Sequence, residues 1–130
     1  MGGHNNAVGR WGEDRAVEHL ESSGYTILAR NWRSPVPEVR GEVDIIAAKD
    51  DVLVVCEVKT RLTAGYGDPV EAVSAAQVRR VRALAACWLS QRPSEAAIRP
   101  LRGLRFDVIG VRGYRDPRSV GVVDHFVGAF

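Results

Sequence analysis

The chain alternates between two segments of helical periodicity and several short apolar runs. Apolar residues recur every three or four positions over 7–23 and 75–90, which predicts two helices. Asn6 and Ser74 are placed to cap the starts of these helices, and Gly24 follows the first as its expected end. Strands are predicted over 25–31, 43–48, 52–58, 104–111 and 120–127, with a hairpin turn over 49–51.

The order α-β-β-β-α-β-β favours an α/β fold with a mixed central sheet flanked by helices. A length of 130 residues fits one domain over 1–130. No apolar run approaches the roughly 20 residues of a membrane helix, and the first residues lack the apolar centre of a signal peptide. We therefore expect a cytoplasmic protein that does not contact membranes. Cys56 and Cys87 are expected to be free thiols.

The net charge of +2 conceals an uneven distribution. Residues 1–57 carry six Lys/Arg and ten Asp/Glu, whereas residues 58–130 carry twelve and six. This distribution suits an acidic cluster beside a basic surface for an anionic partner. Arg79, Arg80 and Arg82 flank or oppose the apolar face of the second helix and are candidates for phosphate contacts. A solvated, arginine-rich surface explains the same distribution equally well.

Two acids interrupt the apolar strands of the predicted hairpin. A two-residue turn there places Asp44 opposite Glu57, with Lys59 on the same face. Neighbouring carboxylates repel unless one is protonated or a cation lies between them. Mg²⁺ prefers such oxygen ligands, and Lys59 is suited to orienting a water or offsetting charge on a phosphate. A cross-strand salt-bridge cluster is the alternative, because Glu-x-Lys spacing is common by chance.

Each helix also carries one polar residue on its apolar face. Glu13 points the same way as the apolar residues of the first helix, so its carboxylate needs a partner if that face is buried. Packing near Asp44 would make it a third acid at one site, whereas its position near the helix start has a dipole explanation. Gln77 lies inward on the second helix, although a capping box with Ser74 also accounts for it.

Other polar residues favour structural explanations. Asp107, Asp124 and His125 interrupt apolar strands, and a hydrogen-bonded core or an edge strand explains them. His4, His19 and His125 do not have the spacing of a zinc site. No phosphate-binding loop, dinucleotide fingerprint or serine-hydrolase elbow occurs in the sequence.

Glu13, GEVD at 41–44 and EVK at 57–59 together resemble the PD-(D/E)xK nuclease superfamily, which has the restriction-endonuclease-like fold. Over about residues 9–130, the chain is also similar to the YraN-like family of uncharacterised bacterial proteins. The segments that carry this similarity are GRWGEDRAVEHLESSGYTILARNWR, GEVDIIA, VVCEVKTR, DPVEAV, RFDVIGV and HFVGAF. That family is similar to archaeal Holliday-junction resolvases.

The resemblance implies a nuclease that uses Mg²⁺ or Mn²⁺ to hydrolyse DNA phosphodiester bonds, with branched DNA and a homodimer as compatible features. The implied catalytic residues are Glu13, Asp44, Glu57, Lys59 and Gln77. The implied metal ligands are Asp44, Glu57 and the carbonyl of Val58, and the implied nucleic-acid contacts are Arg61, Arg79, Arg80 and Arg82.

The chain departs from the pattern of these families in three places. Gln77 stands where Lys is expected, Val43 replaces the Pro before Asp44, and the loop over 34–40 is longer than expected. A non-catalytic nucleic-acid-binding module is the alternative function. An interaction protein whose acids form salt bridges is a third possibility.

Overall fold

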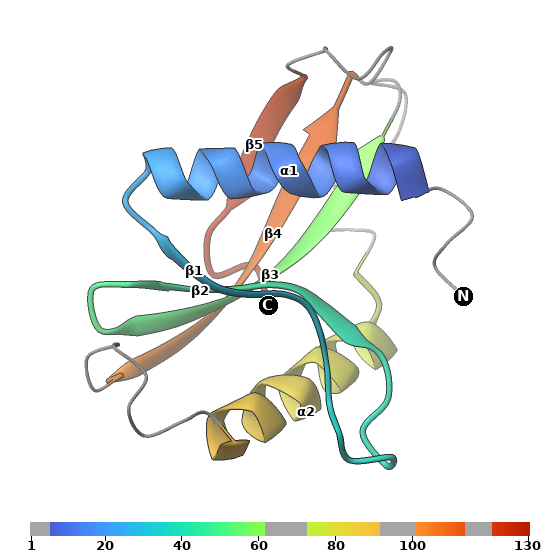
Figure 1. Cartoon of the computed structure of the whole chain (residues 1–130), viewed down its shortest axis with the longest axis vertical. Helices are drawn as coiled ribbons and strands as arrows, with labels where there is room; N and C mark the ends of the chain where they lie inside the picture. Colours follow the sequence, from blue (N-terminus) through green and yellow to red (C-terminus); the bar gives the residue numbers. More distant parts are fainter. Residues whose placement is uncertain (1–5, 62–72, 92–100, 114–120) are drawn as a thin grey trace.

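The computed structural model describes residues 6–61, 73–91, 101–113 and 121–130, and within them the chain forms two helices and five strands (Figure 1). The elements are α1 (Asn6–Ser22), β1 (Thr26–Arg33), β2 (Glu42–Lys49), β3 (Val52–Arg61), α2 (Ala75–Gln91), β4 (Gly103–Arg112) and β5 (Val122–Phe126). This order confirms the predicted α-β-β-β-α-β-β arrangement. It is consistent with a restriction-endonuclease-like fold.

The strands form one mixed sheet in the order β1-β2-β3-β4-β5. Only β3 and β4 run parallel, and the other neighbours are antiparallel. The parallel pair requires a crossover connection, and α2 lies within that connection in the sequence. The β2–β3 pairing runs from Ile45 opposite Cys56 to Lys49 opposite Val52, which is the register that the predicted two-residue turn requires.

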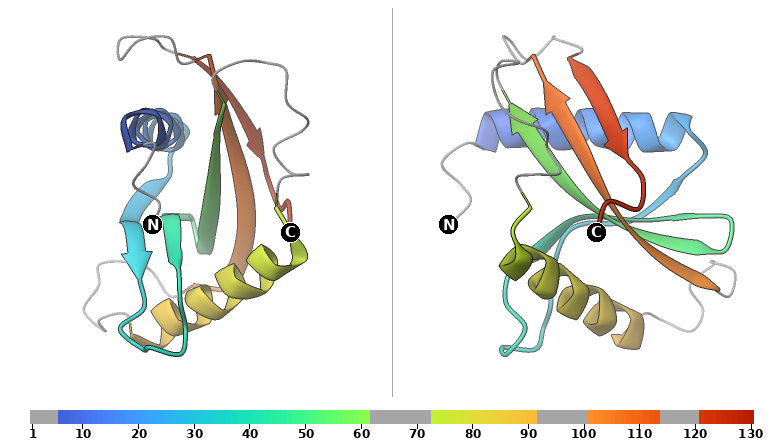
Figure 2. Two further views of the ribbon diagram at one scale, coloured as in Figure 1. Left: turned by 90° about the vertical axis from the view of Figure 1, so that its right-hand side faces the viewer. Right: turned by 180° about the vertical axis from the view of Figure 1, so that it is seen from behind.

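The two helices cover opposite faces of the sheet (Figure 2). Trp11, Ala16 and Leu20 of α1 pack into one buried cluster with inward residues of β2, β3 and β4. Val81, Leu84 and Ala85 of α2 pack into a second cluster on the other face. Neither helix within the described ranges is both long and apolar enough to cross a membrane.

The helix ends follow the local chemistry of the sequence. After α1, Gly24 has a φ of 90°, and the N–H of Tyr25 donates to the Leu20 carbonyl at 2.9 Å. Gly24 therefore ends this helix as predicted. Before α2, the Ser74 hydroxyl accepts a hydrogen bond from the Gln77 N–H at 3.1 Å, which confirms the predicted cap. The first helix begins at Asn6 itself, one residue earlier than predicted.

At Asp44, the alternation of β2 side chains between the two faces of the sheet is interrupted. Val43 packs in the cluster beneath α2, whereas Ile45 packs in the cluster beneath α1. Two residues that far apart in a regular strand share a face, so β2 is twisted here. The regular pairing with β3 also ends at Ile45. Figures 1 and 2 show the beginning of β2 running toward α2 while β3 continues toward α1, so the two strands diverge.

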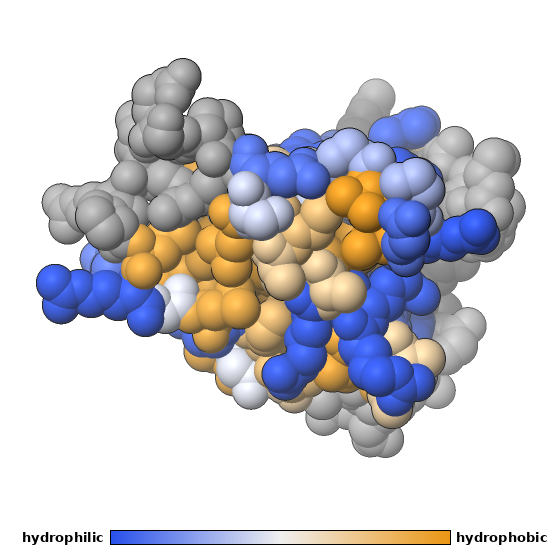
Figure 3. All heavy atoms as spheres, turned by 90° about the horizontal axis from the view of Figure 1, so that it is seen from below, coloured by the Kyte–Doolittle hydropathy of each residue, from blue (hydrophilic) through white to orange (hydrophobic). Residues whose placement is uncertain are grey.

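The surface beside α2 is mixed in character. Figure 3 shows this face from below, with hydrophobic residues continuous over one half and hydrophilic side chains dominating the other. Among the residues that the structure describes, three large hydrophobic side chains are exposed, namely Leu104, Val122 and Val127.

Candidate functional site

Asp44 lies where β2 and β3 separate, and its carboxylate takes the place of a missing strand pairing. The N–H of Val58 donates to Oδ2 of Asp44 at 2.8 Å. The N–H and C=O of one strand residue point to the same side of the strand. The Val58 carbonyl is therefore directed toward the side on which the Asp44 carboxylate lies, beyond the last paired residues of the ladder.

Gln77 links the remaining two strand residues of the predicted site. Its Nε2 donates to Oε2 of Glu57 at 2.5 Å, and its Oε1 accepts from Nζ of Lys59 at 3.3 Å. Glu57 is only 5% exposed. One amide from α2 thus orients both a buried carboxylate and an ammonium group from β3. The cap with Ser74 involves the main chain of Gln77, so capping does not account for its side chain.

The surroundings of the Asp44 and Glu57 carboxylates disfavour their charged forms. Burial, and secondly the charge of Glu57, raise the pKa of Asp44 to about 8. Burial also raises the pKa of Glu57, while Lys59 and the Gln77 hydrogen bond act in the opposite direction. In the described part of the chain, Lys59 donates to Gln77 rather than pairing with either acid. This geometry weighs against a simple salt-bridge cluster, and the oxygen donors suit a hard divalent cation.

Glu13 approaches the same region from α1. Its side chain is 16% exposed, and its Oε1 accepts from Nδ2 of Asn31 at 3.0 Å. Burial raises its pKa, whereas Asn31 and Arg30 lower it. The charge of Glu13 contributes to the raised pKa of Asp44, so the two acids lie within electrostatic range of one another.

The close approach of α1 to β3 depends on Gly12. A Cβ at this position would overlap the side chain of Thr60. Gly12 precedes Glu13 in the helix and Thr60 follows Lys59 in the strand, so this contact sets the distance between the helix-borne acid and the strand-borne residues.

The described residues contain no group of three or more His, Cys, Asp or Glu arranged to hold a metal ion.

The four predicted phosphate-contacting arginines lie in different environments. Arg80 passes against Gly41, which has a φ of 97°, and a Cβ there would lie 2.7 Å from Cδ of Arg80. The charge of Arg80 lowers the pKa of Glu57. Arg82 stacks over the ring of Phe106 at 5.2 Å, and Arg79 is exposed on α2. Nη1 of Arg61 donates to the Thr60 carbonyl at 3.1 Å.

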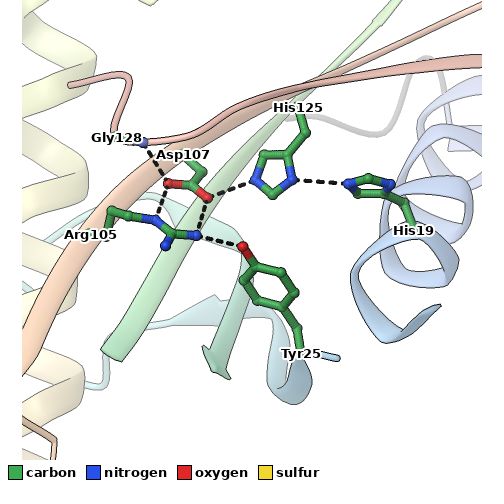
Figure 4. A network of polar contacts seen from close by, with 6 residues as sticks. All are labelled: His19, Tyr25, Arg105, Asp107, His125 and Gly128. Carbon is green, nitrogen blue, oxygen red and sulfur yellow. Dashed lines mark hydrogen bonds and ion pairs between the residues drawn. The ribbon is translucent and has the colours of Figure 1, made fainter. Parts of the chain in front are cut away.

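A second polar group surrounds Asp107, which is fully buried (Figure 4). Arg105 donates to both carboxylate oxygens of Asp107 at 2.9 Å, and the N–H of Gly128 donates at 2.9 Å. His125 lies 2.7 Å from the same carboxylate and shares a 2.9 Å hydrogen bond with His19. Arg105 also donates to the Tyr25 hydroxyl at 2.6 Å. The hydrogen-bonded core expected for Asp107 is confirmed.

The hydrogen bonds to Asp107 outweigh the effect of its burial. Burial alone would raise the pKa of Asp107, but donation from His125, Arg105 and Gly128 holds it at about 2. Burial and the nearby His125 lower the pKa of His19. Sequence reasoning missed Arg105 as the partner, although the spacing of two residues along a strand places its side chain on the same face as Asp107. It also missed Asn31.

Known proteins resemble the chain over most of its length. The model of the uncharacterised protein family UPF0102 matches residues 12–111. A UPF0102 protein of Parafrankia sp. is 46% identical, with 95% of each chain covered. Relatives from Nocardioides sp. and Rhodococcus opacus are each 42% identical, covering 94% and 98% of this chain and 90% and 98% of their own. The resemblance to the YraN-like family is thereby confirmed, and the chain belongs to UPF0102.

Proposed function

We propose that this protein is a metal-dependent nuclease that hydrolyses phosphodiester bonds in DNA. One observation carries the proposal. Where β2 and β3 separate, the carboxylates of Asp44 and Glu57 adjoin the Val58 backbone, and Gln77 joins Glu57 to Lys59. A pure binding module has no need of two buried, mutually repelling acids beside an ammonium group. The resemblance to the PD-(D/E)xK pattern supports the same function.

The chain supplies oxygen donors that fit Mg²⁺ or Mn²⁺. The carboxylates of Asp44 and Glu57 and the carbonyl of Val58 would hold the ion, with water completing its coordination. When bound, the ion supplies positive charge that stabilises the phosphoryl oxygens and lowers the pKa of water. Binding would also favour the ionised form of Asp44, whose pKa is raised to about 8 in the protein alone.

The other residues of the site position the reactants. Lys59 orients the attacking water or stabilises charge that develops on the phosphate. Gln77 fixes Lys59 and Glu57 relative to each other through one amide. Glu13 adds negative charge from α1 that acts on Asp44, and Arg80, whose charge acts on Glu57, would contact the DNA backbone from α2. Phosphate contacts of this kind make DNA binding dependent on salt.

A direct test titrates Mg²⁺ and Mn²⁺ with supercoiled plasmid and a four-way DNA junction as substrates. Asp44→Asn keeps the size of the side chain and removes its charge, so cleavage should fall by at least about 100-fold. Asp124→Asn is the matched control, because Asp124 pairs with Arg112 at 3.4 Å in an exposed position. It should cleave as the wild type does, and EDTA should abolish cleavage by both.

Two results would contradict the nuclease. Equal cleavage by the wild type and Asp44→Asn would show that the acid does not participate. DNA binding without cleavage in either metal would favour the alternative, a non-catalytic nucleic-acid-binding module. Comparing plasmid with junction DNA, and measuring the mass of the protein in solution, tests the expectations of branched DNA and a homodimer.

A further inference from the structure

Asn31 has an unusual backbone at the position opposite Asp44. Its φ is 49°, a left-handed conformation that few residues other than Gly adopt and that Asn tolerates best. The β1–β2 pairing places Arg30 opposite Ile45 and Trp32 opposite Val43, so Asn31 falls across from Asp44. The same position is therefore irregular in both strands.

This backbone directs the Asn31 side chain toward α1. Successive side chains of a regular strand point to opposite faces. Here Arg30 donates to Asp14 at 2.8 Å and Asn31 donates to Glu13 at 3.0 Å, so both side chains reach α1. Trp32 then packs in the cluster beneath α2. Local irregularities of strands commonly re-aim a side chain in this way.

We propose that Asn31 is a positioning residue that holds the Glu13 carboxylate toward Asp44. The inference rests on the proposed nuclease for its catalytic consequence, whereas the positioning itself is a property of the contact. A strained backbone persists where the surrounding structure and the side-chain contact support it. At this position an amide donor is compatible with the left-handed backbone, and the amide contacts the acid that α1 brings to the site.

The chain offers a matched control for this backbone. Asp50, in the hairpin turn at the other end of β2, is the second non-glycine residue with positive φ among the described residues, at 56°. Asn31→Gly and Asp50→Gly both introduce a residue that suits such a backbone, so their effects on stability should be similar. Only Asn31→Gly removes the amide donor to Glu13, whereas Arg30, whose Nη2 lies 3.7 Å from the same Oε1, is kept in every variant.

The test is a double-mutant cycle between Asn31→Gly and Glu13→Ala, with Asp50→Gly as control. Two quantities are measured for each variant, the Kd for Mn²⁺ by calorimetry and the kcat and KM for DNA cleavage. Loss of one hydrogen bond to the partly buried Glu13 carboxylate should lower kcat about fivefold and leave KM unchanged. Mn²⁺ binding should weaken about threefold, because the negative charge of Glu13 is no longer held near the ion. Adding Asn31→Gly to Glu13→Ala should change neither quantity further.

The outcomes separate this inference from the nuclease. Non-additive losses in both quantities support both proposals. The wild type could cleave no DNA while the effects of Asn31→Gly and Glu13→Ala on the Kd for Mn²⁺ are non-additive. That result would support the positioning role and refute the nuclease. If the wild type cleaves DNA, three results would overturn the positioning role. Asn31→Gly could have the same kcat and Kd as Asp50→Gly, its losses could add fully to those of Glu13→Ala, or it could raise KM alone. A wild type that neither binds Mn²⁺ nor cleaves DNA would overturn both.

Discussion

Replacing Asp107 with Asn removes the charge at the centre of the buried network while keeping the shape of the side chain. The carboxylate accepts four hydrogen bonds, two from Arg105 and one each from His125 and Gly128. An Asn side chain has one acceptor oxygen, and its NH₂ group would face donors. Arg105 would also lose its buried counter-charge. The variant should therefore be much less stable than the wild type.

The size of the effect follows from the environment of Asp107. Its pKa falls from 3.8 to about 2, which corresponds to about 2 kcal/mol in favour of the ionised form in the folded state. Unpaired donors add to this loss, and breaking a buried pair is worth roughly 3–5 kcal/mol. Arg105 is 27% exposed, so water relieves part of the loss. We expect about 3 kcal/mol, and a Tm lower by about 10 °C.

Urea unfolding followed by tryptophan fluorescence measures this loss, because the chain contains three Trp residues. Asp124→Asn is the control, since its exposed pair with Arg112 is worth at most about 1 kcal/mol. A loss for Asp107→Asn no larger than that of the control would refute the reasoning. The stability that the Asp107 carboxylate contributes to the wild type also depends on pH. Because the pKa of Asp107 is lowered in the folded state, this contribution is present above pH 3.8 and is lost as the pH falls toward about 2.

Three further changes test other contacts. The lowered pKa of His19 means that stability should fall as the pH drops below its ordinary value of 6.5, and thermal unfolding of His19→Gln should lack this dependence. Gly12→Ala should cost about 1–3 kcal/mol in urea unfolding through overlap with Thr60, and Thr60→Ala should restore part of the loss. Gln77→Leu should lower cleavage about tenfold by releasing Lys59 and Glu57, whereas Ser74→Ala, which removes only the cap, should lower stability by about 1 kcal/mol and leave cleavage unchanged.

Much of the fold could be predicted because local signals agree with one another. Helical periodicity, the Ser74 cap and Gly24 define two helices, and the short turn before β3 fixes the register from Ile45 opposite Cys56 onward. The register could not predict where the pairing stops. Asp44 was expected directly opposite Glu57, but the strands diverge there and its carboxylate binds the Val58 N–H instead. The point at which twisted neighbouring strands diverge has no signature in the periodicity of the sequence.

The candidate site was predicted in its residue types more than in its contacts. Glu13, Asp44 and Glu57 stood out as acids on apolar faces. The side chain of Gln77 could be assigned to a cap or to the site from the sequence, and only tertiary structure distinguishes these. Asn31 gave no signal, because a positive φ in the middle of a strand depends on the strands around it.

The hydrogen bond from the Gly128 N–H to Asp107 allows opening of the buried network to be measured at a single amide. This amide is bonded to a carboxylate that also contacts β5 through His125, and His125 in turn contacts His19 of α1. Exchange of the Gly128 amide with solvent therefore requires its hydrogen bond to Asp107 to open, and Asp107 is linked through His125 to β5 and α1. An amide after the end of the last strand would ordinarily exchange early through fraying. Slow hydrogen–deuterium exchange at Gly128 would instead report opening of the network that joins α1, β4 and β5.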